Sequence, residues 1–297
     1  MPGRFGRVCT AMATPFRKDG SLDLDGAQQL ARHLVEHGTD TVVLAGTTGE
    51  SPTLTHEERD RLVRGVVEAI GGERVMAGTS TYSTAESLEL TAQAEKAGAT
   101  SFLLVAPYYN KPTQEGLYAH FAAIAGSTAL PCMVYNIPSR SVVQISVPTL
   151  VRLAAIDNIV AVKEAVGDMV ANSQLRREVG DAMEQYSGDD KNLLPLLSVG
   201  GVGVVSVAAH LVGPSINELI VAWERGDHAA ALDLHLRNLE LFEGLFATSS
   251  PILLKAALNE IGLPGGPLRL PMVDASPDEV AFVRDLLARH DVVRPAS

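Results

Sequence analysis

The stretch Ile159-Val160-Ala161-Val162-Lys163-Glu164-Ala165 decides the fold, because it places a lysine at the end of an otherwise apolar strand. β-Branched and small apolar residues in an unbroken run are typical of a strand that is covered on both faces, as in a parallel sheet. The Gly167-Asp168 pair that follows is a turn signal. Lys163 is therefore predicted at the carboxyl end of a buried strand.

This lysine has two interpretations. Burial disfavours the charged ammonium group and lowers its pKa, and a neutral amine attacks ketones to form a Schiff base. In the alternative, Lys163 pairs with Glu164 or extends its ammonium group to water. The heptapeptide alone leaves both interpretations open.

The composition is that of an ordinary globular protein, with 46% hydrophobic and 20% charged residues among 297. This length suits one large α/β barrel or two ordinary domains. The chain carries 24 basic and 35 acidic residues, a net charge of −11, and has no basic cluster. We therefore expect a soluble cytoplasmic protein with no nucleic-acid partner, in which local groups must hold any anionic substrate.

Neither cysteine suggests a disulfide or a metal site. Cys9 and Cys132 both lie in apolar runs and are predicted to be packed thiols. The N-terminal region has no long apolar segment, and no run of 18 apolar residues occurs in the chain. We expect neither secretion nor a membrane span.

Short apolar runs alternate with amphipathic stretches along most of the chain. Thr55 and Glu58, three residues apart, form a capping box that predicts the start of one helix. The predicted strands are 8–14, 41–45, 74–78, 101–107, 131–135, 159–163, 184–187 and 202–208. The predicted helices between them are 24–36, 55–70, 84–97, 113–126, 147–155, 169–179, 192–199 and 215–225.

Eight strand–helix units in strict alternation predict a parallel sheet, and their length fits an α/β fold of the (β/α)8 TIM barrel type over residues 1–228. The competitor is an open, doubly wound sheet, but no Gly-rich dinucleotide fingerprint follows the first strand. Residues 229–297 break the alternation and are predicted to form a C-terminal appendage of three helices, 229–248, 251–261 and 277–289. No flexible linker precedes them.

Reactive residue types follow several strands, at the end where barrel enzymes carry their active sites. The segments are Gly46-Thr47-Thr48-Gly49-Glu50-Ser51, Ala106-Pro107-Tyr108-Tyr109-Asn110, Tyr135-Asn136-Ile137-Pro138-Ser139-Arg140, Lys163 and Ser187-Gly188-Asp189-Asp190. Each has a plainer interpretation by itself: a helix-capping turn, interface packing, a solvated arginine, or a weak divalent-cation signal. Their coincidence at one face of the barrel indicates a catalytic site.

These segments, together with Val162-Lys163-Glu164-Ala165, resemble the dihydrodipicolinate synthase family, which lies within the Schiff-base pyruvate aldolases. The resemblance runs from about Val8 to Arg269-Leu270-Pro271 and so covers nearly the whole chain. Thr-Thr-Gly-Glu, Tyr-Asn-Ile-Pro and the lysine are shared by the wider class. The narrower signals are the Thr47-Thr48 pair, the Tyr108-Tyr109 pair and Arg140.

The resemblance implies a condensation of pyruvate with aspartate-semialdehyde through a Schiff base on Lys163, without a metal or cofactor. Tyr135 matches the family's proton donor and acceptor. Thr47 and Tyr109 match its proton relay, and the family's equivalent of Tyr109 reaches into a neighbouring subunit. The resemblance therefore implies a homo-oligomer, with a dimer of dimers favoured.

The same resemblance implies the groups that bind substrate. Thr47 and Thr48 match the residues that hold the pyruvate carboxylate, and Val205 matches a position whose backbone contacts pyruvate. Gly188 also falls at a substrate-binding position. Arg140 is expected to bind the semialdehyde carboxylate with both arms of its guanidinium group.

In relatives that lysine inhibits, the effector lies near the positions that match Ser51, His56, Glu86 and Tyr108. An asparagine and a histidine of that site appear here as Tyr82 and Arg59. These departures favour an enzyme that lysine does not inhibit.

Two alternative functions stay open at this point. A related aldolase for a sugar acid would share Lys163, Tyr135 and Thr47, but has no need for an arginine two residues past Pro138. A barrel that binds a keto acid without turnover would belong to a different class, and the intact lysine, tyrosine and threonine count against it.

Overall fold

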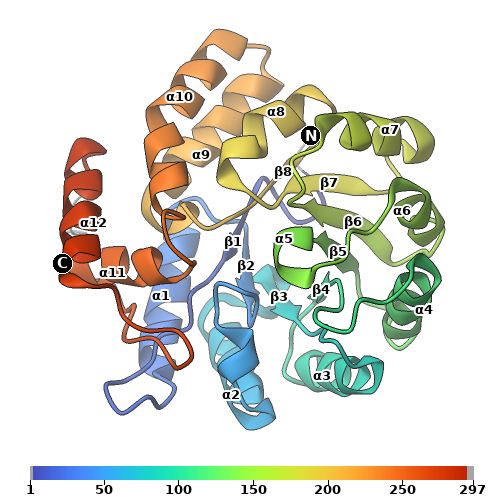
Figure 1. Cartoon of the computed structure of the whole chain (residues 1–297), viewed down its shortest axis with the longest axis horizontal. Helices are drawn as coiled ribbons and strands as arrows, with labels where there is room; N and C mark the ends of the chain where they lie inside the picture. Colours follow the sequence, from blue (N-terminus) through green and yellow to red (C-terminus); the bar gives the residue numbers. More distant parts are fainter. Residues whose placement is uncertain (1–2, 293–297) are drawn as a thin grey trace.

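The computed structural model describes residues 3–292. The first two residues of the predicted barrel region and the last five of the predicted appendage, 1–2 and 293–297, lie outside the described range. Eight parallel strands close into a barrel in sequence order, with β8 paired to β1 (Figure 1). The strands are β1 (Val8–Ala11), β2 (Thr41–Leu44), β3 (Val75–Gly78), β4 (Ser101–Val105), β5 (Cys132–Asn136), β6 (Ile159–Glu164), β7 (Glu184–Ser187) and β8 (Gly203–Ser206). The predicted barrel is confirmed.

Helices surround the strands, as Figure 1 shows. The outer helices are α1 (Leu24–Glu36), α2 (His56–Ile70), α3 (Thr84–Lys96), α4 (Gln114–Ala125), α6 (Val147–Leu153), α7 (Met169–Val179), α8 (Leu193–Ser198) and α9 (Ala209–Glu224). The Thr55–Glu58 capping box at the start of α2 is present. Among the described residues, no helix has the length and apolar character needed to cross a membrane.

Apart from shifts at element ends and three short 3-10 turns, two helices differ from the prediction. The helix expected from residue 215 begins at Ala209, because a kink at Val212 joins a short first segment to a second one in which Pro214 occupies the tolerated first turn. A single-turn helix, α5 (Pro138–Ser141), lies in the loop after β5 and carries Arg140. It is too short for hydrophobic periodicity to reveal it.

Two hydrophobic layers hold the barrel together. The inner layer fills the barrel itself and includes Cys9, Val43, Met133, Tyr186 and Val205. The outer layer lies between the strands and the surrounding helices, and Cys132 belongs to it. Both cysteines are buried free thiols, as predicted. A filled interior confines any binding site to the barrel's mouth.

Three helices follow the barrel: α10 (His228–Gly244), α11 (Ile252–Glu260) and α12 (Pro277–Arg289). They gather on one side of the molecule, drawn in orange to red in Figure 1. Helix α10 packs against α9, and α12 packs against α10 and α11. The segment after α10 also reaches the mouth of the barrel, where the candidate site lies.

Candidate active site

Lys163 sits near the end of β6 with its side chain turned into the barrel mouth, and only 5% of it is exposed. Burial lowers the pKa of its ammonium group to about 8, and the neighbouring Asp190 carboxylate opposes part of that shift. No salt bridge within residues 3–292 involves Lys163. The structure therefore favours the reactive interpretation of this lysine over the solvated one.

Glu164 does not neutralise Lys163, because consecutive strand residues point to opposite faces. Its carboxylate accepts hydrogen bonds from Asn136 Nδ2 at 3.0 Å and from the Val166 backbone N–H at 2.9 Å. Burial raises the pKa of Glu164 to about 7. The predicted alternative of a Lys163–Glu164 pair is thus wrong.

Tyr135 on β5 is the register partner of Lys163 on β6. The Lys163 Nζ lies 4.0 Å from the centroid of the Tyr135 ring. Burial raises the pKa of the Tyr135 phenol, while the Arg140 guanidinium and the Thr47 hydroxyl act in the opposite direction. The phenol therefore stays protonated near neutral pH and can donate a proton to a group bound at Lys163.

Thr47 and Thr48 lie in the loop 46–51 after β2, which is closed by hydrogen bonds within it. The Gly49 N–H donates to Gly46 O at 3.1 Å, and the Glu50 N–H donates to Thr47 O at 3.1 Å. The Thr14 hydroxyl, in the segment after β1, fixes the loop by donating to Gly49 O at 2.7 Å. The result is a rigid turn whose hydroxyl and N–H groups suit a carboxylate.

These groups converge on one cavity of about 280 Å³. Its lining contains the predicted residues Thr47, Thr48, Tyr135, Arg140, Lys163 and Gly188. A second cavity of about 210 Å³ adjoins it and shares Thr47, Tyr135 and Arg140. Six of the eight predicted site residues therefore meet at one place.

Gly188 follows β7 and touches the stem of Lys163. A Cβ at position 188 would lie 2.8 Å from the Ala165 Cβ and 3.1 Å from the Lys163 Cε. Any larger residue at position 188 would therefore force Ala165 or the Lys163 side chain to move.

Arg140 lies on α5 and lines both cavities. Its Nη2 donates to Ser250 O at 3.4 Å, which leaves most of the guanidinium donors free. A planar cation of this kind can bind a carboxylate with two parallel hydrogen bonds.

Two predicted residues do not line the cavity. Val205 is 1% exposed and belongs to the barrel's inner layer, whereas Val207, two residues later, faces the cavity. Tyr109 is 88% exposed and has a positive φ of 74°. A bulky side chain in this backbone region is strained, and here it is exposed to solvent and does not line either cavity.

The Asp189-Asp190 pair does not form a cation site. Both carboxylate oxygens of Asp190 are engaged: one accepts from the Ser206 hydroxyl, and the other accepts from the backbone N–H groups of Val207 and Ala208 at 3.1 and 3.0 Å. Asp190 thus ties the segment after β7 to the carboxyl end of β8. Within residues 3–292, no group of three His, Cys, Asp or Glu side chains is placed to hold a metal ion.

The sequence reasoning missed one wall of the cavity. Phe242, Glu243, Phe246 and Ser250, from α10 and the segment after it, line the cavity opposite the strand loops. Lys191 also lines it and lies 3.8 Å from Glu243. No local signal marks the four residues from α10 and the segment after it, because they reach the site only through the packing of the C-terminal helices.

Comparison with known proteins identifies the family. The profile described as "Dihydrodipicolinate synthetase family" matches residues 4–290. The chain belongs to this family. The resemblance predicted from the sequence motifs is confirmed.

Relatives within this family agree with that assignment over almost their whole length. The chain is 51% identical over 288 residues to the 4-hydroxy-tetrahydrodipicolinate synthase of Acidothermus cellulolyticus, covering 97% of this chain and 93% of that protein. The crystal structure of dihydrodipicolinate synthase from Bacillus anthracis superposes with a TM-score of 0.94 at 44% identity and covers 97% and 99% of the two chains. The dihydrodipicolinate synthase of Cyanidioschyzon merolae, solved with lysine bound, gives a TM-score of 0.95 at 44% identity with the same coverage. Members of the dihydrodipicolinate synthetase family therefore share this barrel.

Proposed function

We propose that this chain is a 4-hydroxy-tetrahydrodipicolinate synthase of the diaminopimelate and lysine pathway. It condenses pyruvate with L-aspartate-4-semialdehyde through a Schiff base on Lys163. The observation that carries the proposal is a buried lysine with a pKa near 8 beside a protonated tyrosine, in a cavity that also presents two threonines and an arginine. The relatives named as this synthase support the choice of substrates.

The first half of the reaction uses Lys163 and Tyr135. The neutral Lys163 amine adds to the C2 carbonyl of pyruvate, and the resulting hydroxyl leaves as water after it takes a proton from the Tyr135 phenol. The protonated imine then acts as an electron sink, so that loss of a methyl proton gives an enamine. Thr47 and Thr48 hold the pyruvate carboxylate during these steps.

The second half forms the new carbon–carbon bond. The enamine carbon attacks the aldehyde carbon of the semialdehyde, and the developing alkoxide takes a proton. The amine of the joined product then attacks the imine carbon and displaces the Lys163 amine as the ring closes. Arg140 holds the semialdehyde carboxylate, and a return of the proton through Tyr135 and Thr47 resets the site.

Tyr109 supports a homo-oligomer, because a large, strained and 88% exposed tyrosine at the mouth of a barrel suits a surface that another subunit covers. We propose that it completes the proton relay of a neighbouring subunit and that two such dimers form a tetramer. Sedimentation equilibrium of wild type and Tyr109→Ala tests the assembly. A monomeric, fully active wild type would contradict it.

The proposed substrates are small cytoplasmic metabolites, which supports a cytoplasmic location. The net charge of −11 argues against a nucleic-acid partner.

The decisive experiment is borohydride reduction in the presence of pyruvate, followed by peptide mapping. We expect a pyruvate-sized adduct on the peptide that contains Lys163, and no adduct in Lys163→Ala. Turnover with aspartate-semialdehyde but not with N-acetylmannosamine excludes the sugar-acid alternative. An adduct without turnover of either aldehyde would instead favour a barrel that only binds a keto acid.

The Arg140→Ala variant tests whether Arg140 binds the aldehyde and not pyruvate. We expect the KM for the aldehyde to rise by at least about tenfold while the pyruvate-dependent adduct forms as in wild type, because Arg140 is assigned to the second substrate. Unchanged kcat and KM for the aldehyde would remove the main support for this substrate.

A further inference from the structure

Glu50 closes the loop 46–51 and has a buried carboxylate. Its side chain is 2% exposed, and its backbone has a positive φ of 53°, which is strained for a residue with a side chain. The carboxylate accepts hydrogen bonds from Lys255 Nζ at 2.6 Å and from the Arg269 backbone N–H at 3.0 Å. Both partners belong to the C-terminal part of the chain, more than 200 residues away.

Lys255 on α11 is itself fully buried. Besides Glu50, its ammonium group donates to Pro267 O at 2.8 Å and lies 4.4 Å from the centroid of the Phe16 ring. If this lysine moved, the buried Glu50 carboxylate would keep the hydrogen bond from the Arg269 N–H but lose the cation that balances its charge. The ion pair is therefore a rigid link between α11 and the loop after β2.

Arg269 forms a second link beside the first. Its guanidinium carbon lies 4.0 Å from the centroid of the Phe16 ring. The guanidinium also donates two hydrogen bonds to the Glu58 carboxylate. It also donates to Thr53 O at 2.8 Å and to Gly20 O at 2.9 Å. Arg269 belongs to the loop between α11 and α12, residues 261–276, called the C-terminal loop below. It thus fastens this loop to the first turn of α2 and to the loop after β1.

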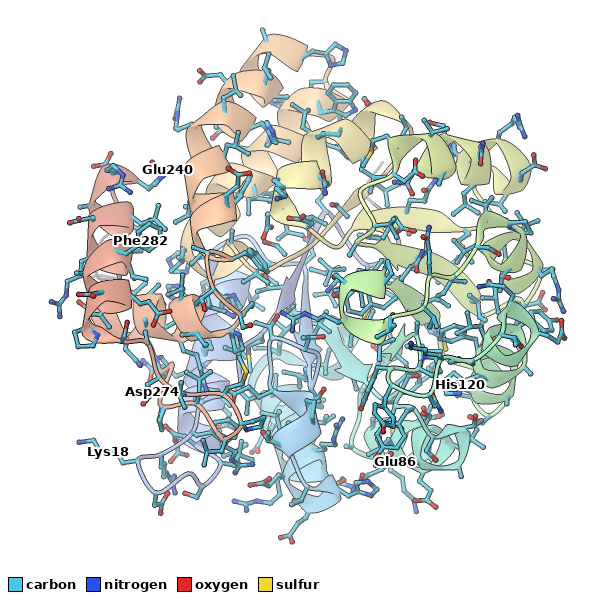
Figure 2. All side chains as sticks on the ribbon, viewed as in Figure 1. Lys18, Glu86, His120, Glu240, Asp274 and Phe282 are labelled. Carbon is cyan, nitrogen blue, oxygen red and sulfur yellow. The ribbon has the colours of Figure 1, made fainter. Side chains whose placement is uncertain are left out.

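The C-terminal loop lies directly on the barrel. A Cβ at Gly266 would lie 2.1 Å from Phe16 O, and Gly266 has a positive φ of 67°, so this position accepts only glycine. Figure 2 shows Asp274 on this loop beside the loop that carries Lys18, in agreement with the Arg269–Gly20 hydrogen bond. Asp274 in turn accepts from the Leu268 N–H at 2.7 Å and holds the loop in shape.

From these contacts we infer that Lys255 and Arg269 are positioning residues for the reaction. Through Glu50 they fix the loop that presents Thr47 and Thr48 to the pyruvate carboxylate. The inference rests on the proposed function for its catalytic meaning. The C-terminal helices then supply both a wall of the cavity and the anchor of its carboxylate-binding loop.

The Glu50–Lys255 ion pair also affects the charge near the proposed pyruvate site. Glu50 lies two residues from Thr48, in a chain whose net charge already repels an anionic substrate. The Lys255 ammonium at 2.6 Å neutralises this carboxylate. Loss of Lys255 alone would leave a negative charge close to the place where the pyruvate carboxylate binds.

Two variants and a control test the inference. Lys255→Met leaves the Glu50 charge buried, whereas the double variant Glu50→Gln with Lys255→Met removes both charges at nearly constant volume and so protects the fold. The control is Glu260→Gln with Arg284→Met, because that ion pair, 2.6 Å long, lies in the same C-terminal helices at the surface. Circular dichroism and thermal unfolding establish that each variant is folded.

The first measurement is hydrogen exchange at the amides of residues 47–51, which needs no substrate. We expect at least tenfold faster exchange in the double variant and no change in the control. The second is the pyruvate concentration that half-saturates borohydride trapping. We expect it to rise at least tenfold in Lys255→Met and at least threefold in the double variant, with the KM for the aldehyde within twofold of wild type.

Unchanged exchange at residues 47–51 in the folded double variant would overturn the inference. Half-saturation by pyruvate within twofold of wild type, in a wild type that does form the adduct, would also overturn it. A wild type that forms no pyruvate adduct would overturn the proposed function instead, and the exchange measurement would still decide whether α11 anchors the loop.

Discussion

The Lys163 ammonium lies 4.0 Å from the centroid of the Tyr135 ring, and the two residues are register partners on adjacent strands. One position further along, Asn136 and Glu164 are also register partners and are joined by a hydrogen bond of 3.0 Å on the outer face of the barrel. The Ala165 N–H donates to Asn136 O at 3.0 Å. The amine and the phenol are therefore held together by backbone pairing as well as by their own packing.

The lowered pKa of Lys163 determines how the rate of imine formation depends on pH. With a pKa of about 8 in place of 10.5, about one amine in ten is neutral at pH 7, against roughly one in 3,000 for an ordinary lysine. The rate of imine formation with pyruvate should rise by about tenfold per pH unit below pH 8 and level off above it. Stopped-flow or borohydride-quench rates between pH 6 and 10 measure this, and an inflection near pH 10 would contradict it.

The proton relay predicts a contrast between two neighbouring threonines. Tyr135→Phe and Thr47→Val should each lower kcat on the order of 10²-fold, because both remove a hydroxyl from proton transfer. Thr48→Val should mainly raise the KM for pyruvate, since Thr48 is assigned only to the carboxylate. Steady-state kinetics of the three variants measure the difference, and equal losses of kcat in Thr47→Val and Thr48→Val would refute the relay role of Thr47.

Glu164 predicts a pH dependence of stability. Burial raises its pKa from 4.5 to about 7, so the folded state favours the protonated carboxyl. Its contribution to the free energy of unfolding is greatest below pH 4.5 and falls by about 3 kcal/mol as the pH rises to 7. Relative to wild type, Glu164→Gln should therefore become more stable as the pH rises from 4.5 to 8.

Urea unfolding at several pH values measures the Glu164 effect. Glu89→Gln, an exposed change on α3, is the control and should shift stability by less than about 0.5 kcal/mol at every pH. A constant difference between Glu164→Gln and wild type would show that Glu164 does not titrate in this range.

Arg59 predicts the response to free lysine. Its guanidinium donates to Ser51 O at 2.6 Å and to Gly78 O at 3.2 Å, and both residues line the cavity beside the active site. Tyr82 packs edge-on against Tyr108 with the ring centroids 5.3 Å apart. A fixed internal cation at this position disfavours a second one, so lysine should not inhibit the enzyme. Activity across a lysine titration tests this, and clear inhibition at millimolar concentrations or below would contradict it.

Features encoded by neighbouring residues could be predicted from the sequence. The apolar run before Lys163, the strict alternation of units and the Thr55–Glu58 capping box each report a local preference, and each appears in the structure. Strand ends meet at one face of a closed barrel, so the sequence alone predicts that the six site residues that line the cavity lie together.

Features that depend on distant contacts could not be predicted. The Glu50–Lys255 pair joins residues 205 positions apart, and its lysine lies in an ordinary helical pattern that does not indicate burial. The same holds for Phe246, which reaches the cavity only because α10 packs against α9. Tertiary packing decides both positions, and no local propensity reports it.

The glycine at position 188 also bears on protein engineering. Because the lysine stem already occupies the space that a methyl group would need, a mutagenesis library aimed at longer aldehydes should keep this position fixed. Diversity belongs on the wall formed by α10 and the segment after it, where Phe246 lines the cavity and is 40% exposed. Replacing Phe246 with a smaller residue should enlarge the cavity on this wall.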